Sequence, residues 1–331
     1  MKKTAIIILN WNGAALLPEF LPQVIENTDT SAADIIVADN GSTDDSITLL
    51  RNRFPEVKVM EFDRNYGFAE GYNRAIALAE GYEYVVLLNS DVAPRAGWNQ
   101  VLQQFMDSHP DVAAVQPKIL AYNDRDKFEY AGASGGFIDR HGYPYCRGRI
   151  FDVVETDRGQ YDTPMEIFWA SGAALMVRRN LYLKAGGLDG EFFAHMEEID
   201  LCWRLQLMGY KIMVIPAAAV YHLGGGSLDY GNPRKTYLNF RNNLLMMHKN
   251  LPAGVRRRKL FVRRLMDTLA WVKFMVSLNF KSANAILRAH RDYARMSRNY
   301  TSDPSIDLLE QQQTDIVRKR YLHGKKHFSD L

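Results

Sequence analysis

The feature that most constrains this chain is the run Tyr84-Val85-Val86-Leu87-Leu88, which ends in Asn89-Ser90-Asp91. Five apolar or aromatic residues without a break predict a strand that is buried on both faces, as in a parallel sheet covered by helices. Ligands of open α/β sheets bind beyond the carboxyl ends of the strands. Asp91 is therefore expected where a carboxylate can hold a divalent cation, and the cation a phosphate. The alternative is that Asp91 only begins the turn toward Pro94.

Buried strand patterns alternate with helical patterns around this run. Strands are expected at 4–9, 34–38 and 57–62, with helices between them, the first at 14–27. This alternation predicts an α/β fold with a doubly wound, mostly parallel sheet. Later segments predict a helix at 96–108, a strand at 112–115, one buried strand at 167–177, and short strands at 211–215 and 217–221. Residues 120–165 show no clear period and predict a long irregular segment, which is usually functional or mobile.

Polar, turn-forming residues follow each of the first three strands. They are Asn10-Trp11-Asn12-Gly13, then Asp39-Asn40-Gly41, then Asn65-Tyr66-Gly67. The first strand is not followed by G-x-G-x-x-G, and the chain has no G-x-x-x-x-G-K-[ST], so dinucleotide-binding and P-loop interpretations are disfavoured. The polar residues instead predict a ligand site of another kind at the carboxyl edge.

The helix predicted at 196–208 carries a candidate general base. At 100° per residue, Glu198 shares an apolar arc with Leu201 and Leu205, whereas Asp200 and Arg204 lie on the other side and can form a surface pair. An acid that faces the interior is rare unless it is paired or functional. Glu198 is therefore favoured as the base over Asp200, and the alternative is an ion pair or cap that satisfies Glu198.

The charge of the chain is divided between two parts. Residues 231–331 carry 21 Lys and Arg against 7 Asp and Glu, a net charge of +14, whereas residues 1–230 carry 20 against 31, a net charge of −11. We therefore expect a domain at 1–230 and a basic, mainly helical extension at 231–331. A tail with this positive charge is typical of binding to nucleic acid, to anionic lipid or to a phosphorylated substrate. No stacking or groove-reading motif accompanies it, so nucleic acid is not an expected partner.

Residues 256–276 predict an amphipathic helix within the tail. Phe261, Leu265, Leu269, Val272 and Val276 share one face, and Arg263 and Asp267 lie on the opposite one. The apolar face can pack on the domain or lie on a membrane surface. With two cysteines and no run of about 18 apolar residues, we expect a cytoplasmic protein, with peripheral contact at the inner face of the cytoplasmic membrane as an open alternative.

Several motifs, in order, resemble those of the family 2 glycosyltransferases, which are inverting enzymes with a GT-A fold. The similarity covers roughly residues 4–227 and is closest to the bacterial rhamnosyltransferase-like branch. It rests on the segments already quoted and on Trp169-Ala170-Ser171-Gly172-Ala173, Met196-Glu197-Glu198-Ile199-Asp200 and Val220-Tyr221-His222. It implies a Rossmann-like nucleotide-binding half and a nucleotide-sugar donor.

The resemblance also implies roles for individual residues. It implies that the nucleotide sugar is bound by Asn10, Asn12, Asp39, Asn40, Asn65, Gly67, Asn73 and Asn89. Asp39 would contact the pyrimidine base. It also implies that Asp91 and His222 bind a Mg²⁺ or Mn²⁺ ion and that Glu198 and Asp200 are the catalytic residues. Trp169, Ser171, Gly172 and Glu197 would bind the acceptor, which is a saccharide or a polyprenyl-linked saccharide.

Two positions depart from the family pattern. Asn89 stands where the D-x-D motif has its first acid, and Glu198 stands where many relatives have Asp. These departures are the best support for an inactive glycan-binding or scaffold protein. A nucleotidyltransferase is a second alternative, but residues 10–16 lack the basic residues that would hold a triphosphate. We expect a glycosyltransferase that uses a dTDP- or UDP-linked sugar.

Overall fold

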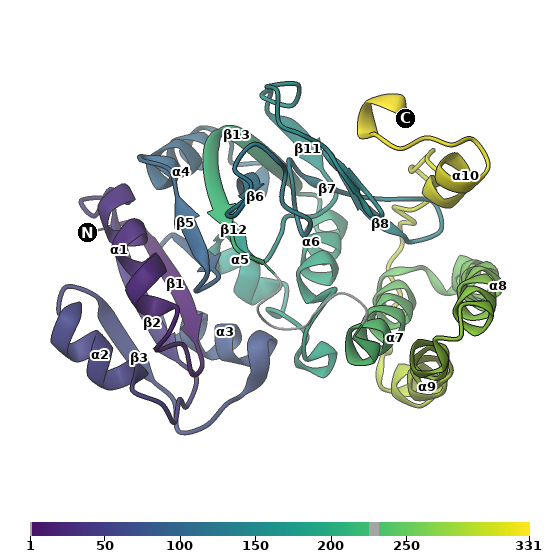
Figure 1. Ribbon diagram of the computed structural model, residues 1–331, viewed down its shortest axis with the longest axis horizontal. Coiled ribbons are helices and arrows are strands. Elements are labelled where there is room, and N and C mark those ends of the chain that lie inside the picture. The colour runs from purple at the N-terminus through teal and green to yellow at the C-terminus, as the bar shows by residue number, and fades with distance from the viewer. Residues whose placement is uncertain (1, 225–231) are drawn as a thin grey trace.

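The computed structural model describes residues 2–224 and 232–331, so the expected domain boundary at 230 lies outside the described residues. The first half confirms the predicted alternation. In order, its elements are β1 (Thr4–Asn10), α1 (Leu17–Asn27), β2 (Ala33–Asp39), α2 (Ser46–Arg53), β3 (Lys58–Glu61), α3 (Gly67–Leu78) and β4 (Tyr84–Leu88). β4 is buried at all five residues, as the apolar run predicts. Strands β1 to β4 pair in parallel, in the order β4-β1-β2-β3 (Figure 1).

The pairing register brings the polar carboxyl ends together. Asn10, the last residue of β1, lies opposite Asp39, the last residue of β2, and Ile8 lies opposite Leu88 at the end of β4. Asn89 and Asp91 therefore follow a strand that ends beside the loop after β1. The polar carboxyl ends of these strands therefore lie along one edge of the sheet, as predicted.

The second half extends this sheet with strands of both directions. Its elements are β5 (Val92–Pro94), α4 (Trp98–Ser108), β6 (Val112–Ala121), β11 (Met165–Ile167), β12 (Ala174–Arg178), α5 (Arg179–Lys184), η1 (Gly190–Phe192), α6 (Glu197–Leu207) and β13 (Lys211–His222). The order continues from β4 through β12, β6 and β13 to β11, with β5 on β13. β12 runs antiparallel to β4 and β6, and β13 runs parallel to β6.

Two strand predictions in this half are wrong in detail. Residues 167–177 form two strands, β11 and β12, because the small residues at 170–173 turn the chain between them. Residues 211–222 form one strand, because β13 crosses Pro216 by a register shift instead of ending there.

Residues 120–165 are also more regular than predicted. They contain β7 (Gly136–Ile138), β8 (Pro144–Cys146), β9 (Arg149–Ile150) and β10 (Val153–Val154), which form a second, antiparallel sheet. These strands are two or three residues long, which is too short to show an alternating pattern in the sequence. The Trp169 ring packs on Gly136, where a Cβ would lie 2.1 Å from the ring, and this contact fixes the small sheet against the main one.

The tail is mainly helical, as predicted. It forms α7 (Pro233–Asn250), α8 (Ala253–Val276), α9 (Phe280–Met296), η2 (Ser297–Asn299), α10 (Ile316–Tyr321) and η3 (Phe328–Asp330). Helices α7, α8 and α9 form one group beside α6, whereas α10 lies next to the small sheet near β8 (Figure 1). Within the described residues, no helix combines the length and apolarity needed to cross a membrane.

Helix α8 exposes its apolar face to solvent and buries part of its polar face. Phe261, Leu265, Leu269, Val272 and Val276 are between 44% and 79% exposed. Arg263 and Asp267 are buried instead, joined to each other at 2.8 Å. Asp267 also accepts from Tyr143 of the small sheet (3.3 Å) and contacts His290 of α9 (3.1 Å). Of the two alternatives left open by the sequence, the structure excludes packing of the apolar face on the domain, because a buried polar network attaches the helix instead.

Candidate active site

The ends of β1 and β2 build a rigid polar corner. The Asn10 amide donates to Asp39 Oδ2 (2.8 Å) and to Ser42 Oγ (3.2 Å), and the Ser42 backbone N–H donates to Asp39 Oδ1 (2.9 Å). The Asn12 backbone N–H donates to Ser42 Oγ (2.8 Å), and the Asn12 side-chain oxygen accepts from the Thr43 backbone N–H (2.8 Å). The structure therefore brings Asn10, Asn12 and Asp39 together, although Asp39 is only 2% exposed.

A second amide network joins β2 to the loop before α3. Asn40 donates to Asn65 Oδ1 (3.1 Å) and to the Gly67 carbonyl (3.0 Å), and it accepts from the Tyr66 backbone N–H (2.9 Å). Gly67 has φ +79°, which favours glycine at this position. Asn40, Asn65 and Gly67 thus form one connected segment beside the polar corner.

Asn73 is placed differently from the other donor candidates. Its amide donates to the Leu188 carbonyl (2.8 Å), and its oxygen accepts from the Leu188 N–H (2.9 Å) and from Tyr182 Oη (2.6 Å). These contacts occupy the side chain in holding the turn at 186–188 against α3. Asn73 therefore stabilises the backbone around the site through its contacts with Leu188 and Tyr182.

The carboxyl end of β4 meets the end of β13 at an acid–histidine pair. Asp91 Oδ1 lies 3.1 Å from His222 Nε2, and Asn89 Nδ2 lies 3.3 Å from the same nitrogen. On the far side of the ring, His222 Nδ1 lies 3.6 Å from Glu129 Oε1. Burial alone would lower the pKa of His222, but contacts with the Asp91 and Glu129 carboxylates raise the pKa to about 10. Sequence reasoning missed Glu129, which lies in the segment without clear periodicity.

These residues fit part of a site for a hard cation. Carboxylate, imidazole and amide groups are suitable ligands, and a second carboxylate, Glu129, lies 3.6 Å from the other nitrogen of the histidine, where metal-bound histidines usually have an acceptor. Among residues 2–224 and 232–331, no cluster of three or more acids, histidines and cysteines is placed to hold a metal by itself. The remaining ligands would have to come from a bound diphosphate and water.

Two adjacent acids stand at the first turn of α6. Glu198 Oε2 and Glu197 Oε2 are buried and have no hydrogen-bond partner. Burial raises the pKa of Glu198 to about 7 and outweighs the backbone N–H groups at the helix N-terminus, which lower it. Burial and the neighbouring Glu198 charge raise the pKa of Glu197 well above its usual value. A carboxyl with one unpaired oxygen and a pKa near 7 is suited to accept a proton at neutral pH.

Asp200 has a contrasting environment, and its predicted surface position is wrong. The residue is fully buried. Its Oδ2 accepts from Arg204 Nε (2.9 Å) and Lys249 Nζ (2.9 Å), and its Oδ1 accepts from Asn250 Nδ2 (2.7 Å). Burial alone would raise the pKa of Asp200, but the Arg204 and Lys249 charges lower it. Lys249 and Asn250 come from α7 in the tail, which no pattern near 200 could reveal.

The segment that leads into α6 is strained and held by the tail. Phe193, His195 and Met196 have φ values of 65°, 70° and 77°, a region that costs energy for residues other than glycine. The Asn242 amide of α7 donates to the carbonyls of Phe192 (2.9 Å), Ala194 (2.9 Å) and His195 (2.8 Å). Arg241 donates to the carbonyls of Glu191 and Phe192, both at 3.0 Å. These two residues, also missed from the sequence, fix the entry to the helix that carries Glu198.

Three of the four acceptor candidates lie in the loop before β12, and the fourth, Glu197, is the buried neighbour of Glu198. A Cβ at Gly172 would lie 3.8 Å from Glu198 Cβ and 3.5 Å from Phe68. Gly172 therefore lies between the acid and residues 65–69, the donor segment, which carries candidate donor-binding residues. Trp169 is 4% exposed and donates to the Phe137 carbonyl (2.9 Å), and Ser171 is 2% exposed and donates to the Ala131 carbonyl (2.6 Å). Trp169 and Ser171 therefore fix the loop at 169–173 through these buried hydrogen bonds.

Comparison with known proteins identifies the family. The family "Glycosyl transferase family 2" matches residues 5–182. An N-acetylglucosaminyl-diphospho-decaprenol L-rhamnosyltransferase of Mycobacterium tuberculosis is 26% identical over 66% of this chain and 75% of its own. A dTDP-rhamnosyl transferase of Shigella flexneri is 24% identical over 59% of this chain and 64% of its own.

Solved structures agree on the fold. Staphylococcus aureus TarS, residues 1–349, in complex with UDP-GlcNAc has a TM-score of 0.60 at 16% identity, over 90% of this chain and 81% of that one. GalNAc-T7 with UDP, GalNAc and Mn²⁺ has a TM-score of 0.59 at 14% identity, over 75% of this chain and 48% of that one. The chain thus belongs to the family 2 glycosyltransferases, in the rhamnosyltransferase-like branch, and has their GT-A fold.

Proposed function

We propose that the chain transfers a sugar with inversion from a dTDP- or UDP-linked donor to a hydroxyl of a growing polysaccharide or lipid-linked saccharide. The observation that carries this proposal is the half-buried Glu198 carboxyl, whose Oε2 has no hydrogen-bond partner, beside Gly172 and the donor segment. The relative from Mycobacterium tuberculosis, named for a decaprenol-linked acceptor, and the dTDP-rhamnosyl transferase of Shigella flexneri support the choice of acceptor and donor.

In this proposal, Glu198 acts as the general base. The free oxygen of Glu198 accepts the proton of the acceptor hydroxyl. The oxygen of this hydroxyl attacks the anomeric carbon at the same time, and the bond from this carbon to the nucleoside diphosphate breaks. Asn10 and Asp39 bind the nucleotide, and Asn40 with Asn65 holds the Gly67 segment against it. Asp200 holds α6 to the tail and positions Glu198, because each Asp200 oxygen is already engaged.

Asp91 and His222, with the Asn89 amide beside them, would hold a Mg²⁺ or Mn²⁺ ion. When bound, such an ion stabilises the negative charge of a leaving diphosphate. Asn89 carries no charge, so the protein supplies less negative charge than a motif with two acids.

We expect Glu129→Gln to raise the Mn²⁺ concentration for half-maximal activity by about 10–100-fold, because Glu129 orients the histidine ligand. The measurement is a metal titration after treatment with a chelator. Glu155→Gln serves as control, because this buried acid of the same region accepts from Tyr161 and from the Phe328 backbone N–H and forms no ion pair with His222. An unchanged titration for Glu129→Gln would show that His222 has only a structural role.

The proposed activity is tested with a panel of dTDP-, UDP- and GDP-linked sugars in the presence of Mn²⁺. We expect release of the nucleotide from a dTDP- or UDP-linked sugar, slowly to water and faster with a saccharide acceptor. A scaffold protein would release none from any member of the panel, and that result would contradict the proposal.

We also propose that the protein is cytoplasmic and that α8 contacts the inner face of the membrane. The exposed apolar residues of α8 are accompanied by Arg257, Arg258, Arg264 and Lys273, all exposed. Asp267 is the only acid in the helix, and it is buried. An apolar face with a cationic rim complements an anionic bilayer, whereas a second copy would bring like charges together.

We expect Leu265→Ser with Leu269→Ser to weaken binding to phosphatidylglycerol vesicles by at least about tenfold, since each exposed leucine loses its burial in lipid. Vesicle flotation measures this. Leu78→Ser with Leu183→Ser removes two exposed leucines from α3 and α5 and should bind as the wild type does. Equal flotation of both variants would exclude α8 as the contact surface.

A further inference from the structure

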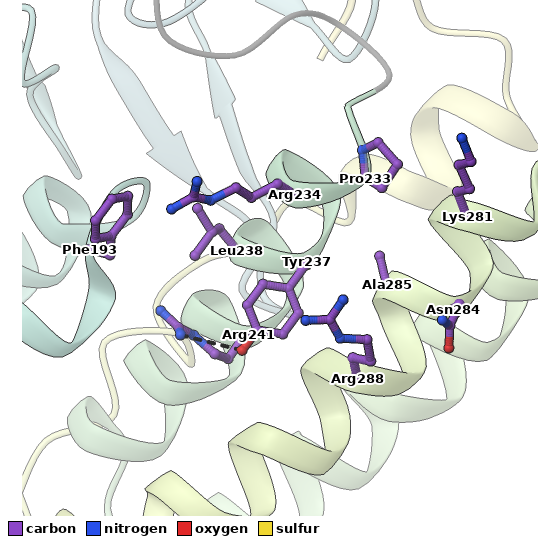
Figure 2. Close-up of a pocket in the computed structure, with 10 residues that line it drawn as sticks. All are labelled: Phe193, Pro233, Arg234, Tyr237, Leu238, Arg241, Lys281, Asn284, Ala285 and Arg288. Atoms are coloured by element: carbon purple, nitrogen blue, oxygen red, sulfur yellow. Dashed lines mark hydrogen bonds between the residues drawn. The ribbon is translucent and has the colours of Figure 1, made fainter.

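A cationic cavity of 460 Å³ lies between α7, α9 and the strained segment before α6 (Figure 2). Arg234 and Arg241 reach it from α7, and Lys281 and Arg288 reach it from α9. None of the described residues that line it is acidic. The cavity therefore favours an anion, and the sequence motifs of the donor site do not include any of its residues.

The four cations are not equivalent. Arg241 is buried, and its guanidinium is already engaged with the carbonyls of the segment before α6. Arg234, Lys281 and Arg288 are exposed, and Arg288 lies over the Tyr237 ring at 5.2 Å. Arg241 thus forms part of the wall, whereas the other three cations can turn toward a ligand. Several donors on one anionic group are typical of phosphate recognition.

Phe193 connects this cavity to the active site. Its ring lines the cavity and lies under Arg234, with the guanidinium carbon 4.9 Å from the ring centroid. The same ring lies 3.6 Å from the position of a Cβ at Gly67, in the donor segment. Phe193 precedes Glu198 by five residues on a backbone that Asn242 holds. The cavity therefore adjoins the donor segment and the strained segment that leads to Glu198, and none of the described residues that line it is Asp91 or His222.

The rim of the cavity continues into exposed apolar residues. Lys281 directly follows Phe280, which is 57% exposed, and Leu278 just before it is 74% exposed. Leu278 belongs to the turn between α8 and α9, and Phe280 is the first residue of α9, next to the proposed membrane face. A ligand bound here would have an anionic group at Lys281 and Arg288 and apolar surface beside it.

We propose that this cavity binds the diphosphate group of a lipid-linked acceptor, whose hydrocarbon chain leaves past Leu278 and Phe280. The inference rests on the proposed function, since it identifies how the acceptor of that reaction is held. The cations are within reach of the membrane face, and the saccharide beyond the diphosphate would extend past Phe193 toward Glu198.

The test measures binding of geranyl diphosphate by calorimetry at low ionic strength, without donor or turnover. We expect Lys281→Ala with Arg288→Ala to weaken binding at least about tenfold, because two charge-assisted contacts are lost. The matched control, Arg295→Ala with Arg298→Ala, removes two exposed charges near the end of α9 and should leave the dissociation constant unchanged. Thermal unfolding of each variant verifies that it is folded.

Three results would overturn the inference: no binding to the wild-type protein, an equal loss in both double variants, or inorganic pyrophosphate binding as tightly as geranyl diphosphate. The last would assign the cavity to free phosphates. Geranyl diphosphate binding requires no catalysis, and nucleotide release from the donor panel requires no lipid. The two proposals can therefore fail separately.

Discussion

Replacing Glu198 by Gln is expected to lower kcat by at least about 10²-fold, and by up to about 10⁴-fold, the usual contribution of a general base. The substitution keeps the size of the side chain and removes its basicity. Nucleotide binding should stay nearly unchanged, because the polar corner at Asn10 and Asp39 is made by other elements. Glu191→Gln, an exposed acid just before α6, should keep the wild-type rate and serves as control.

The pH profile of the wild-type protein gives a second measurement of the same role. Because burial raises the pKa of Glu198 to about 7, its basic form is lost below that pH. The value of kcat/KM should therefore rise with pH and level off above an apparent pKa near 7, which belongs to the interacting Glu197–Glu198 pair. A profile that is flat from pH 5 to about pH 8 would exclude this carboxyl as the base.

Replacing Asp200 by Asn is expected to lower the free energy of unfolding by about 3–5 kcal/mol, the usual cost of breaking a buried ion pair from one side. Arg204 and Lys249 would remain mostly buried without their shared carboxylate. The connection of α6 to α7 weakens as a result. Denaturant unfolding measures the change.

The control for Asp200 is Asp111→Asn, which removes an acid from an exposed pair with Lys211 (3.0 Å). Exposed pairs contribute about 0–1 kcal/mol, so this variant should be nearly as stable as the wild type. If Asp200→Asn abolished turnover without a loss of stability, and Glu198→Gln remained active, the two roles would have to be exchanged.

The sheet and its ligand edge could be predicted because they depend on local patterns. The run at 84–88 is buried on both faces, and the polar residues after β1 and β2 follow their strands directly. The helix-face assignment within α6 could not be predicted in this way, because Asp200, placed on the outer side by its angle, is fully buried, whereas Glu198 is half-buried. The environment of Asp200 could not, because Lys249 and Asn250 reach it from a helix some 50 residues later in the chain.

Helix α8 shows a second limit of pattern reasoning. Its periodicity identifies an apolar face and a polar face, but it does not say which of them is buried. Arg263 and Asp267 are buried because Tyr143 and His290, on separate elements, complete their polar network. The small sheet, Glu129 and the Asn242 contacts likewise depend on long-range partners.

The most direct test of the central claim is the anomeric configuration of the product, determined by NMR for the donor that the panel identifies. A single displacement assisted by one general base, Glu198, predicts a product of inverted configuration at the anomeric carbon. A product that retains the donor configuration would contradict the account.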